Sequence, residues 1–336
     1  MNSVVRSALL FVMSWLATVS APTAAWAATV TDLYDVSVPL DGGQDAAFLE
    51  ALKAVAVRVS GQRDAANRLG SALTNPRQYA SRFGSAADRR MLQVGFDSVA
   101  IDKLLSTAGL PIWGRERPAT LVLLNIREPD GSSRWADSQF GGAEREAVSR
   151  VARQRGLPLV WPTIDPQEQA RIYAAGFKTA ELLQIAARFG ANATLLGFAQ
   201  RSGNNLAVRW VLATEDGATE LESVLEEGVH LAADTFARAY SASGTAVDNV
   251  LVEISGINNL AAYAAAVNYV EGMTLVRGVA LEQMSGDTMR LRLAVRGDAA
   301  TLRRAMTLDK RLVLQNPPEP GAPRPSSLQF RYQPLQ

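Results

Sequence analysis

His230 has the surroundings most suggestive of chemistry in this sequence. It is the only histidine and no cysteine is present, which excludes His/Cys zinc sites, cysteine nucleophiles and HExxH proteases within one chain. On a predicted helix, Glu226, Glu227 and Asp234 lie within four residues of His230, so one face could hold a metal ion or an acid–base pair. Charged residues opposite an apolar stripe are more typical of a solvated helix face. We therefore predict no metal site, no cofactor and no catalytic residue.

A row of arginines is the second candidate. Arg290, Arg292 and Arg296 have the same parity on a predicted strand, and apolar residues alternate with them, so the three side chains share one face of a sheet. This row is either a platform that binds an anion or a partner, or the solvated face of an antiparallel sheet. We favour the solvated face. Acidic residues nearly balance basic ones in this part of the chain, which argues against nucleic acid.

The run GLPIWGRERP is the most distinctive stretch and carries the third candidate. Two prolines bracket Trp113, Arg115 and Arg117, and this predicts a rigid connector over residues 111–117 that is not a strand. The three side chains are either a binding lip or an anchor between two domains. We favour the anchor, with the indole buried and both guanidinium groups facing water, because tryptophan buries a large apolar area.

Apolar periodicity predicts a multidomain protein of mixed α+β and α/β class around this connector. The expected parts are a small α+β domain (28–110), a mixed-sheet α/β domain (118–241), a ferredoxin-like βαββαβ domain (247–315) and a proline-rich tail (316–336). In the first domain, Tyr79 and Phe83 are expected one turn apart on a short helix. The tail is expected to be mobile unless Phe330 and Tyr332 hold it at a sheet edge.

The first 27 residues have the pattern of a cleaved signal peptide. Arg6 precedes an apolar segment over residues 8–19, and Ala25-Trp26-Ala27 fits a cleavage site. We expect cleavage after Ala27, a periplasmic location, and no transmembrane segment or lipid anchor afterwards. The hydrophobic fraction of 48%, the charged fraction of 20% and the net charge of +1 are ordinary for a globular protein. They give no support to binding of nucleic acid or an anionic membrane.

Three segments carry a family resemblance. VRVSGQRD at 57–64, GLPIWGRERP at 109–118 and GANA at 190–193 resemble the bacterial domain of unknown function 2066. That family is typically exported and has no established activity, so the resemblance implies a periplasmic location and assigns no catalytic residue. The second domain is also broadly similar in fold to the amino-terminal domain of TolB, which is an analogy of fold only.

Two classes of function follow. The first is a non-catalytic envelope factor that binds a protein or a cell-wall component, with candidate binding residues Trp113, Arg115, Arg117, Arg290, Arg292 and Arg296. The second is a hydrolase that uses carboxylate or Ser/Lys chemistry without histidine or cysteine. A pocket with two converging carboxylates of shifted pKa would favour the enzyme. An exposed apolar patch or an open sheet edge would favour binding.

Overall fold

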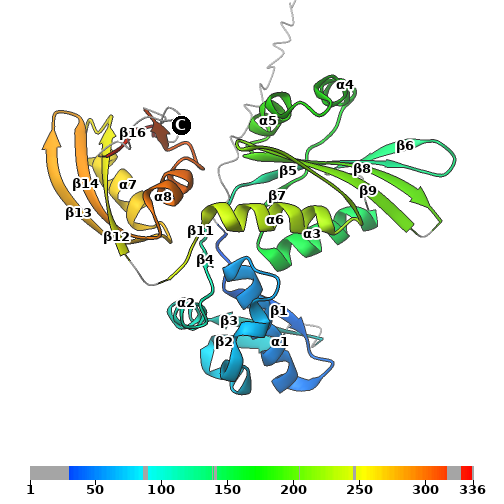
Figure 1. Cartoon of the computed structure of the whole chain (residues 1–336), viewed down its shortest axis with the longest axis horizontal. Coiled ribbons are helices and arrows are strands. Elements are labelled where there is room, and N and C mark those ends of the chain that lie inside the picture. The colour runs from blue at the N-terminus through cyan, green and yellow to red at the C-terminus, as the bar shows by residue number, and fades with distance from the viewer. Residues whose placement is uncertain are drawn as a thin grey trace, which may run out of the picture.

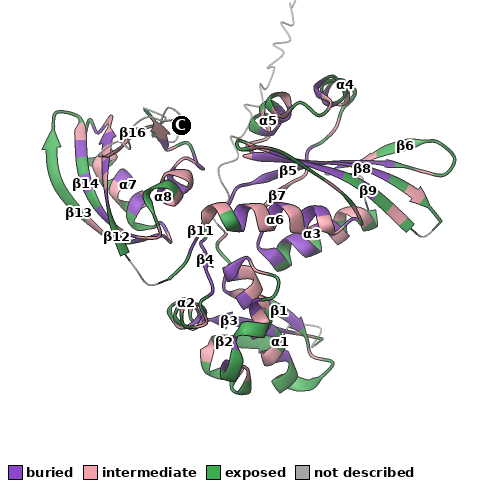
Figure 2. Cartoon of the chain, viewed as in Figure 1, coloured by how far each residue is buried: buried purple, intermediate pink, exposed green. Residues whose placement is uncertain are grey.

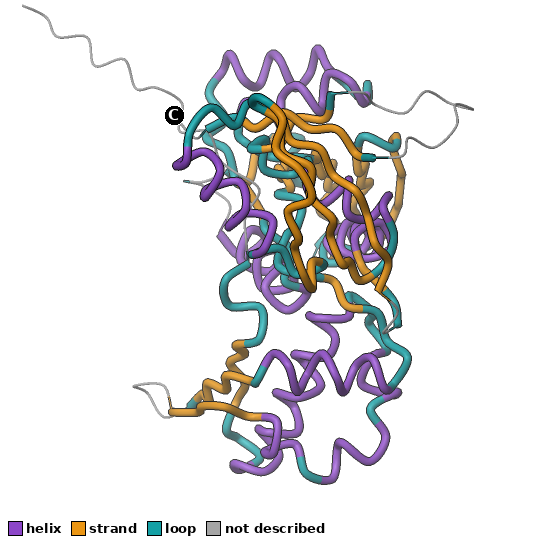
Figure 3. Tube along the Cα trace, turned by 90° about the vertical axis from the view of Figure 1, so that its left-hand side faces the viewer, coloured by secondary structure: helices purple, strands orange, loops and turns teal. Residues whose placement is uncertain are grey.

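The computed structural model describes residues 30–85, 90–137, 139, 142–203, 205–244, 247–315 and 327–334. The expected signal peptide lies outside these residues. The predicted fold class is confirmed, because helices and mixed sheets alternate throughout the described chain. Three units are visible in Figure 1, and Figure 3 shows the N-terminal unit below the other two. Within the described ranges, no helix combines the length and the apolar composition needed to cross a bilayer.

The N-terminal unit is a small antiparallel sheet backed by a long helix. Its elements are β1 (Asp35–Pro39), α1 (Gly43–Ser60), three short 3₁₀ helices (Ala65–Arg68, Gly70–Thr74, Pro76–Tyr79), β2 (Ala80–Ser85), β3 (Met91–Phe96) and α2 (Ser98–Thr107). The strand order is β1-β3-β2. The predicted helix carrying Tyr79 and Phe83 is wrong: Tyr79 ends a 3₁₀ helix and Phe83 lies on β2. Phe83 pairs with Val94 of β3, so a partner strand later in the chain determines its conformation and overrides the local helical spacing.

The middle unit is a mixed sheet with helices on both faces. Its strands are β5 (Thr120–Arg127), β6 (Ser133–Ala136), β7 (Leu159–Val160), β8 (Ala193–Ser202), β9 (Asn205–Thr214) and β10 (Gly217–Ser223). Its helices are α3 (Gly142–Arg155), α4 (Pro166–Ala175), α5 (Thr179–Arg188) and α6 (Glu227–Tyr240). The order is β10-β9-β8-β5-β6, with β7 also paired to β5. Figure 1 shows α3 and α6 on one face and α4 and α5 on the other.

The C-terminal unit has the predicted βαββαβ order, followed by one further strand. Its elements are β12 (Val247–Ser255), α7 (Leu260–Glu271), β13 (Val276–Ser285), β14 (Thr288–Arg296), α8 (Ala299–Met306), β15 (Leu312–Leu314) and β16 (Leu328–Tyr332). The strand order is β13-β14-β12-β16-β15. The prediction of a mobile tail is wrong for β16, which pairs with β12 on one side and β15 on the other. The exception left open in the sequence applies, since Phe330, buried in the core, and Tyr332 both belong to the paired strand. Because β16 has a neighbour on each side, however, they hold the tail inside the sheet and not at its edge.

The connector between the first two units is tied to the chain that leaves the middle unit. Ile112–Trp113 forms β4, a two-residue strand that pairs with β11 (Ser241–Ala242). The expectation that this stretch contains no strand is therefore wrong. The residues between the two prolines keep backbone N–H groups that can donate hydrogen bonds, so the prolines do not prevent this short pairing.

Candidate functional site

Trp113 is buried, as predicted. Its side chain is 0% exposed and belongs to the apolar core of the middle unit. Gly61, which ends α1 with a positive φ of 70°, lies against it: a Cβ at this glycine would be 3.1 Å from the indole and 2.3 Å from Cβ of Ala237. The end of the N-terminal helix therefore approaches Trp113 and α6 so closely that only glycine fits without a shift.

Arg117 is also fully buried, which corrects the expectation that its guanidinium faces water. Its five hydrogen bonds, of 2.8 to 3.0 Å, all go to backbone carbonyl oxygens. The acceptors are Arg58, Trp113, Gly114, Arg155 and Gly156. The guanidinium carbon also lies 3.8 Å from the Trp113 ring centroid. Burial, followed by the positive charge of Arg58, lowers the pKa of Arg117 to about 9. Neither Trp113 nor Arg117 reaches the surface, so they do not form a binding lip.

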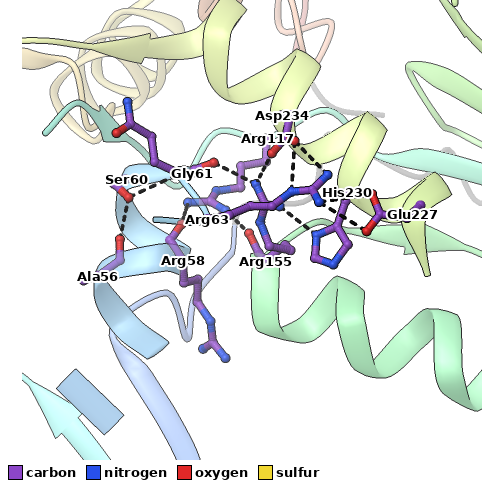
Figure 4. A network of polar contacts seen from close by, with 11 residues as sticks. Ala56, Arg58, Ser60, Gly61, Arg63, Arg117, Arg155, Glu227, His230 and Asp234 are labelled. Atoms are coloured by element: carbon purple, nitrogen blue, oxygen red, sulfur yellow. Dashed lines mark hydrogen bonds and ion pairs between the residues drawn. The ribbon is translucent and has the colours of Figure 1, made fainter. Parts of the chain in front are cut away.

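A second arginine joins the same junction to α6. Arg155 is 2% exposed and donates to the carbonyl oxygen of Gly61 at 2.7 Å, to Asp234 at 2.5 Å and to Nδ1 of His230 at 2.8 Å. Arg63 pairs with Asp234 and with Glu227 at 2.9 and 3.1 Å. Figure 4 shows these groups meeting between α1, α3 and α6. The carboxylates beside His230 are therefore engaged by arginines, and the described residues contain no group of ligands able to hold a metal ion.

The His230 imidazole must accept at Nδ1, because arginine has only donors. Burial, then the charges of Arg63 and Arg155, lowers the pKa of His230, with Glu227 and Asp234 opposing the shift. A histidine that protonates less readily when folded stabilises the protein above its unfolded pKa of about 6.5, and this contribution is lost as the pH falls towards the folded pKa. We expect the wild type to lose more stability between pH 8 and pH 5 than His230→Gln. Urea denaturation at both pH values checks this, and equal losses would contradict it.

The arginine row is paired with carboxylates on neighbouring elements. Arg290 contacts Glu253 of β12 at 2.7 Å, and Arg292 contacts Glu282 of β13. These two guanidinium groups are half exposed and already neutralised, so the row is not a continuous anion platform. Arg296 differs from them. Its side chain is only 13% exposed, and it reaches Asp102 of α2, in the N-terminal unit, at 3.3 Å.

Asp102 marks a cleft between the N-terminal and C-terminal units. Its carboxylate accepts from the Tyr34 hydroxyl at 2.7 Å and also pairs with Arg277 at 3.3 Å. Burial and the charge of Asp102 raise the pKa of Tyr34, whereas burial and the charge of Arg277 lower that of Arg296. Figure 1 shows α2 on the side of its unit that faces the C-terminal unit.

The cleft has a volume of about 620 Å³ and contains more positive than negative side chains. Its cationic residues are Lys103, Arg115, Arg277 and Arg296, and its acidic residues are Asp102 and Glu271. Arg115 is exposed and lies 5.9 Å from the Tyr34 ring centroid. The structure thus brings together Arg115 and Arg296, two residues singled out in the sequence. It also adds Tyr34, Asp102 and Arg277, which no local pattern in the sequence marks as parts of a binding site.

A smaller pocket of about 200 Å³ adjoins the cleft, since Gly272 and Met273 line both. Glu116 and Asp309 line it together with Tyr269. Burial raises the pKa of both carboxyl groups. Each carboxylate also accepts a backbone N–H: Glu116 from Thr274 at 3.1 Å, and Asp309 from Arg311 at 3.0 Å.

Comparison with known proteins finds a family match for one part of the chain. A model of a domain of unknown function, DUF8605, matches residues 27–114. This overturns the resemblance to domain of unknown function 2066. No curated protein and no solved structure matches the chain, so the similarity to TolB is not supported either. The matched region ends at Gly114, directly after Trp113, and includes Tyr34 and Asp102 but none of the arginines in the cleft.

Proposed function

We propose that the protein is a non-catalytic, exported binding protein that holds an anionic ligand or an acidic segment of a partner between its N-terminal and C-terminal units. The observation that carries the proposal is the meeting of Arg115, Arg277 and Arg296 in one cleft. Guanidinium groups bind carboxylates and phosphates through paired, charge-assisted hydrogen bonds. The volume is within the range of ligand sites, about 300–1,000 Å³.

Two of the cationic side chains are available to a ligand. These are Lys103 and Arg115, which are exposed and have no ion-pair partner within the described chain. Arg277 is 40% exposed and shares the Asp102 carboxylate with Arg296, so these two arginines keep a net positive charge, whereas Arg290 and Arg292 each have a carboxylate of their own. Asp102 forms ion pairs with both Arg277 and Arg296 and so fixes the positions of their guanidinium groups in the cleft. A ligand anion would therefore meet guanidinium groups that are already oriented, which lowers the entropic cost of binding.

The experiment is isothermal titration of the mature protein with inorganic phosphate, citrate and a hexaglutamate peptide. Arg115→Gln and Arg277→Gln are expected to weaken binding of the preferred probe by about tenfold or more, because each removes a charge-assisted hydrogen bond. Arg290→Gln is the matched control, since this arginine is similarly exposed, paired with a carboxylate, and outside the cleft. Binding should also weaken as salt is added.

Absence of binding by all three probes at millimolar concentration would overturn the proposal, as would equal effects of the cleft and control variants. The mature form is proposed to begin at Ala28, and the intact mass of protein from its native source checks that cleavage. We also propose periplasmic residence, which the signal-peptide pattern of residues 1–27 supports.

A second candidate function is hydrolysis at the pocket of Glu116 and Asp309. Two carboxyl groups of raised pKa in one pocket are the arrangement that favours acid–base chemistry. It ranks second because both carboxylates are held by backbone N–H groups, which explains their positions without catalysis. Analysis of the titrated mixtures by mass spectrometry for cleaved peptide separates the two candidates, and turnover that disappears in Glu116→Gln would favour the enzyme.

A further inference from the structure

Among the residues that the structure describes, nothing covers one end of the middle-sheet face that carries α4 and α5. The two helices cover an apolar cluster that includes Leu123 on β5, Leu196 on β8 and Val211 on β9. Figure 1 shows β6, β8 and β9 continuing beyond α4 and α5, and Figure 2 shows many exposed residues on that extension. The opposite face is covered by α3 and α6 as far as Ile126 and Val208. At this end of the sheet, the described part of the chain therefore leaves one of the two faces uncovered.

Register determines which side chains lie on the open face. Trp135, Asn125, Phe198 and Arg209 are successive cross-strand partners on β6, β5, β8 and β9, and partners in register point to the same side of a sheet. They have the parity of Leu123 and Leu196, so they continue the face under α4 and α5. The next row outward contains Arg127, Gln200 and Ala207, which are all exposed.

Aromatic side chains gather along this face. Tyr173 of α4 is 51% exposed and its ring lies 5.9 Å from that of Trp135. Phe177 is 43% exposed and lies 5.7 Å from Phe198. Gly176, with a φ of 55°, ends α4 directly before Phe177. Exposed aromatic rings grouped in this way mark interaction surfaces more often than isolated apolar residues do.

Hydrogen-bond donors and acceptors both lie near these aromatic rings. Arg209 lies 4.8 Å from the Phe177 ring centroid and pairs with Glu220 at 2.7 Å, and both charged groups are about half exposed. Beneath the surface, Nδ2 of Asn125 and Nε1 of Trp135 have no acceptor among the described residues. Asn125 is only 8% exposed, and a buried donor without an acceptor costs free energy.

We propose that this open face, the aromatic face of Trp135, Tyr173, Phe177 and Phe198, binds an oligosaccharide. A sugar ring presents an apolar C–H face that packs on aromatic rings and an edge of hydroxyl groups that both donate and accept. Glu220 accepts from hydroxyl groups, while the exposed side chains of Arg209 and Gln200 donate to them. The two buried N–H groups donate once the exposed Tyr173 ring, which lies against Trp135, turns aside. The exposed carboxylates of Glu220 and Glu222 disfavour an anion here. This site is separate from the cleft and does not depend on it.

The test is titration of the mature protein with two neutral sugars, chitotetraose and maltotetraose. Calorimetry and tryptophan fluorescence measure the binding. Phe177→Ala and Trp135→Ala are expected to weaken binding of the preferred sugar by about tenfold, the effect of losing a stacking partner. Phe83→Ala is the matched control, because Phe83 is a phenylalanine that is 45% exposed in the N-terminal unit. Arg115→Gln should leave sugar binding unchanged.

Asn125→Leu distinguishes a ligand site from a merely structural face. Replacing a buried amide whose N–H₂ lacks an acceptor with an apolar side chain of similar size should raise the melting temperature and at the same time weaken sugar binding. Failure of both sugars to bind at millimolar concentration would overturn the proposal. So would equal losses in Phe83→Ala and Phe177→Ala, or binding of a peptide to this face without any sugar binding.

Discussion

Arg117→Met is expected to lower the free energy of unfolding by about 3–5 kcal/mol, because several buried carbonyl oxygens lose their donor and each unsatisfied buried acceptor costs about 1–3 kcal/mol. Methionine fills much of the same volume but has no donor. The carbonyl oxygens of Arg58, Trp113, Gly114, Arg155 and Gly156 would lose the guanidinium that now satisfies them. These acceptors come from the connector and both flanking units, so the loss should appear as one large shift in urea denaturation followed by far-UV circular dichroism.

Two control variants show whether the loss of stability in Arg117→Met comes from the lost hydrogen bonds to carbonyl oxygens. Arg115→Met removes an exposed arginine from the same connector and should change stability by no more than about 0.5 kcal/mol. Arg117→Lys keeps the charge but has three donors in place of five, so it should recover only part of the loss. Wild-type stability in Arg117→Met, or full recovery in Arg117→Lys, would show that the carbonyl network is not what stabilises the junction.

Trp113→Ala is expected to destabilise the protein by about 3–5 kcal/mol, because truncating a fully buried tryptophan removes apolar burial and leaves a cavity. The cavity would lie beside Gly61 and beneath Arg117, whose guanidinium now lies over the indole. Collapse around it is restricted, because β4 is held by its pairing with β11. Thermal unfolding measures the effect.

Trp113→Phe is the control for Trp113→Ala, since it keeps an aromatic ring under Arg117 and should cost clearly less. If Trp113→Ala melted like the wild type, the packing at the junction would not depend on the indole, and the close approach of α1 to α6 would need another explanation.

Local structure was predictable where its cause is local. Asp165 before Pro166 predicts a helix start, and the Asp165 carboxylate indeed accepts from the N–H of Glu168 at 2.7 Å. Apolar periodicity was sufficient to predict the fold class. It failed at Phe83 and at β16, because short segments with few apolar residues take their conformation from a partner strand that lies elsewhere in the chain.

The candidate site was predictable only in part. The sequence singles out Arg115 and Arg296, but residues so far apart give no sign that they line one cleft. It cannot distinguish Arg117, which is buried among carbonyl oxygens, from Arg115, which is exposed two residues earlier. The partners that decide these environments, such as Asp102 for Arg296, lie in other units. The aromatic face likewise depends on the register of four strands.

The position of β16 has a consequence for how the protein folds. β12 and β15 do not pair with each other; both pair with residues 328–332. The sheet of the C-terminal unit therefore cannot be completed until these residues have been synthesised, although their partners on β12 lie 76 residues earlier in the chain, as in the pair Val252 and Leu328. Contacts between distant segments, and parallel pairing in particular, form slowly. The C-terminal unit, and with it one wall of the cleft, should be the last part of the molecule to mature.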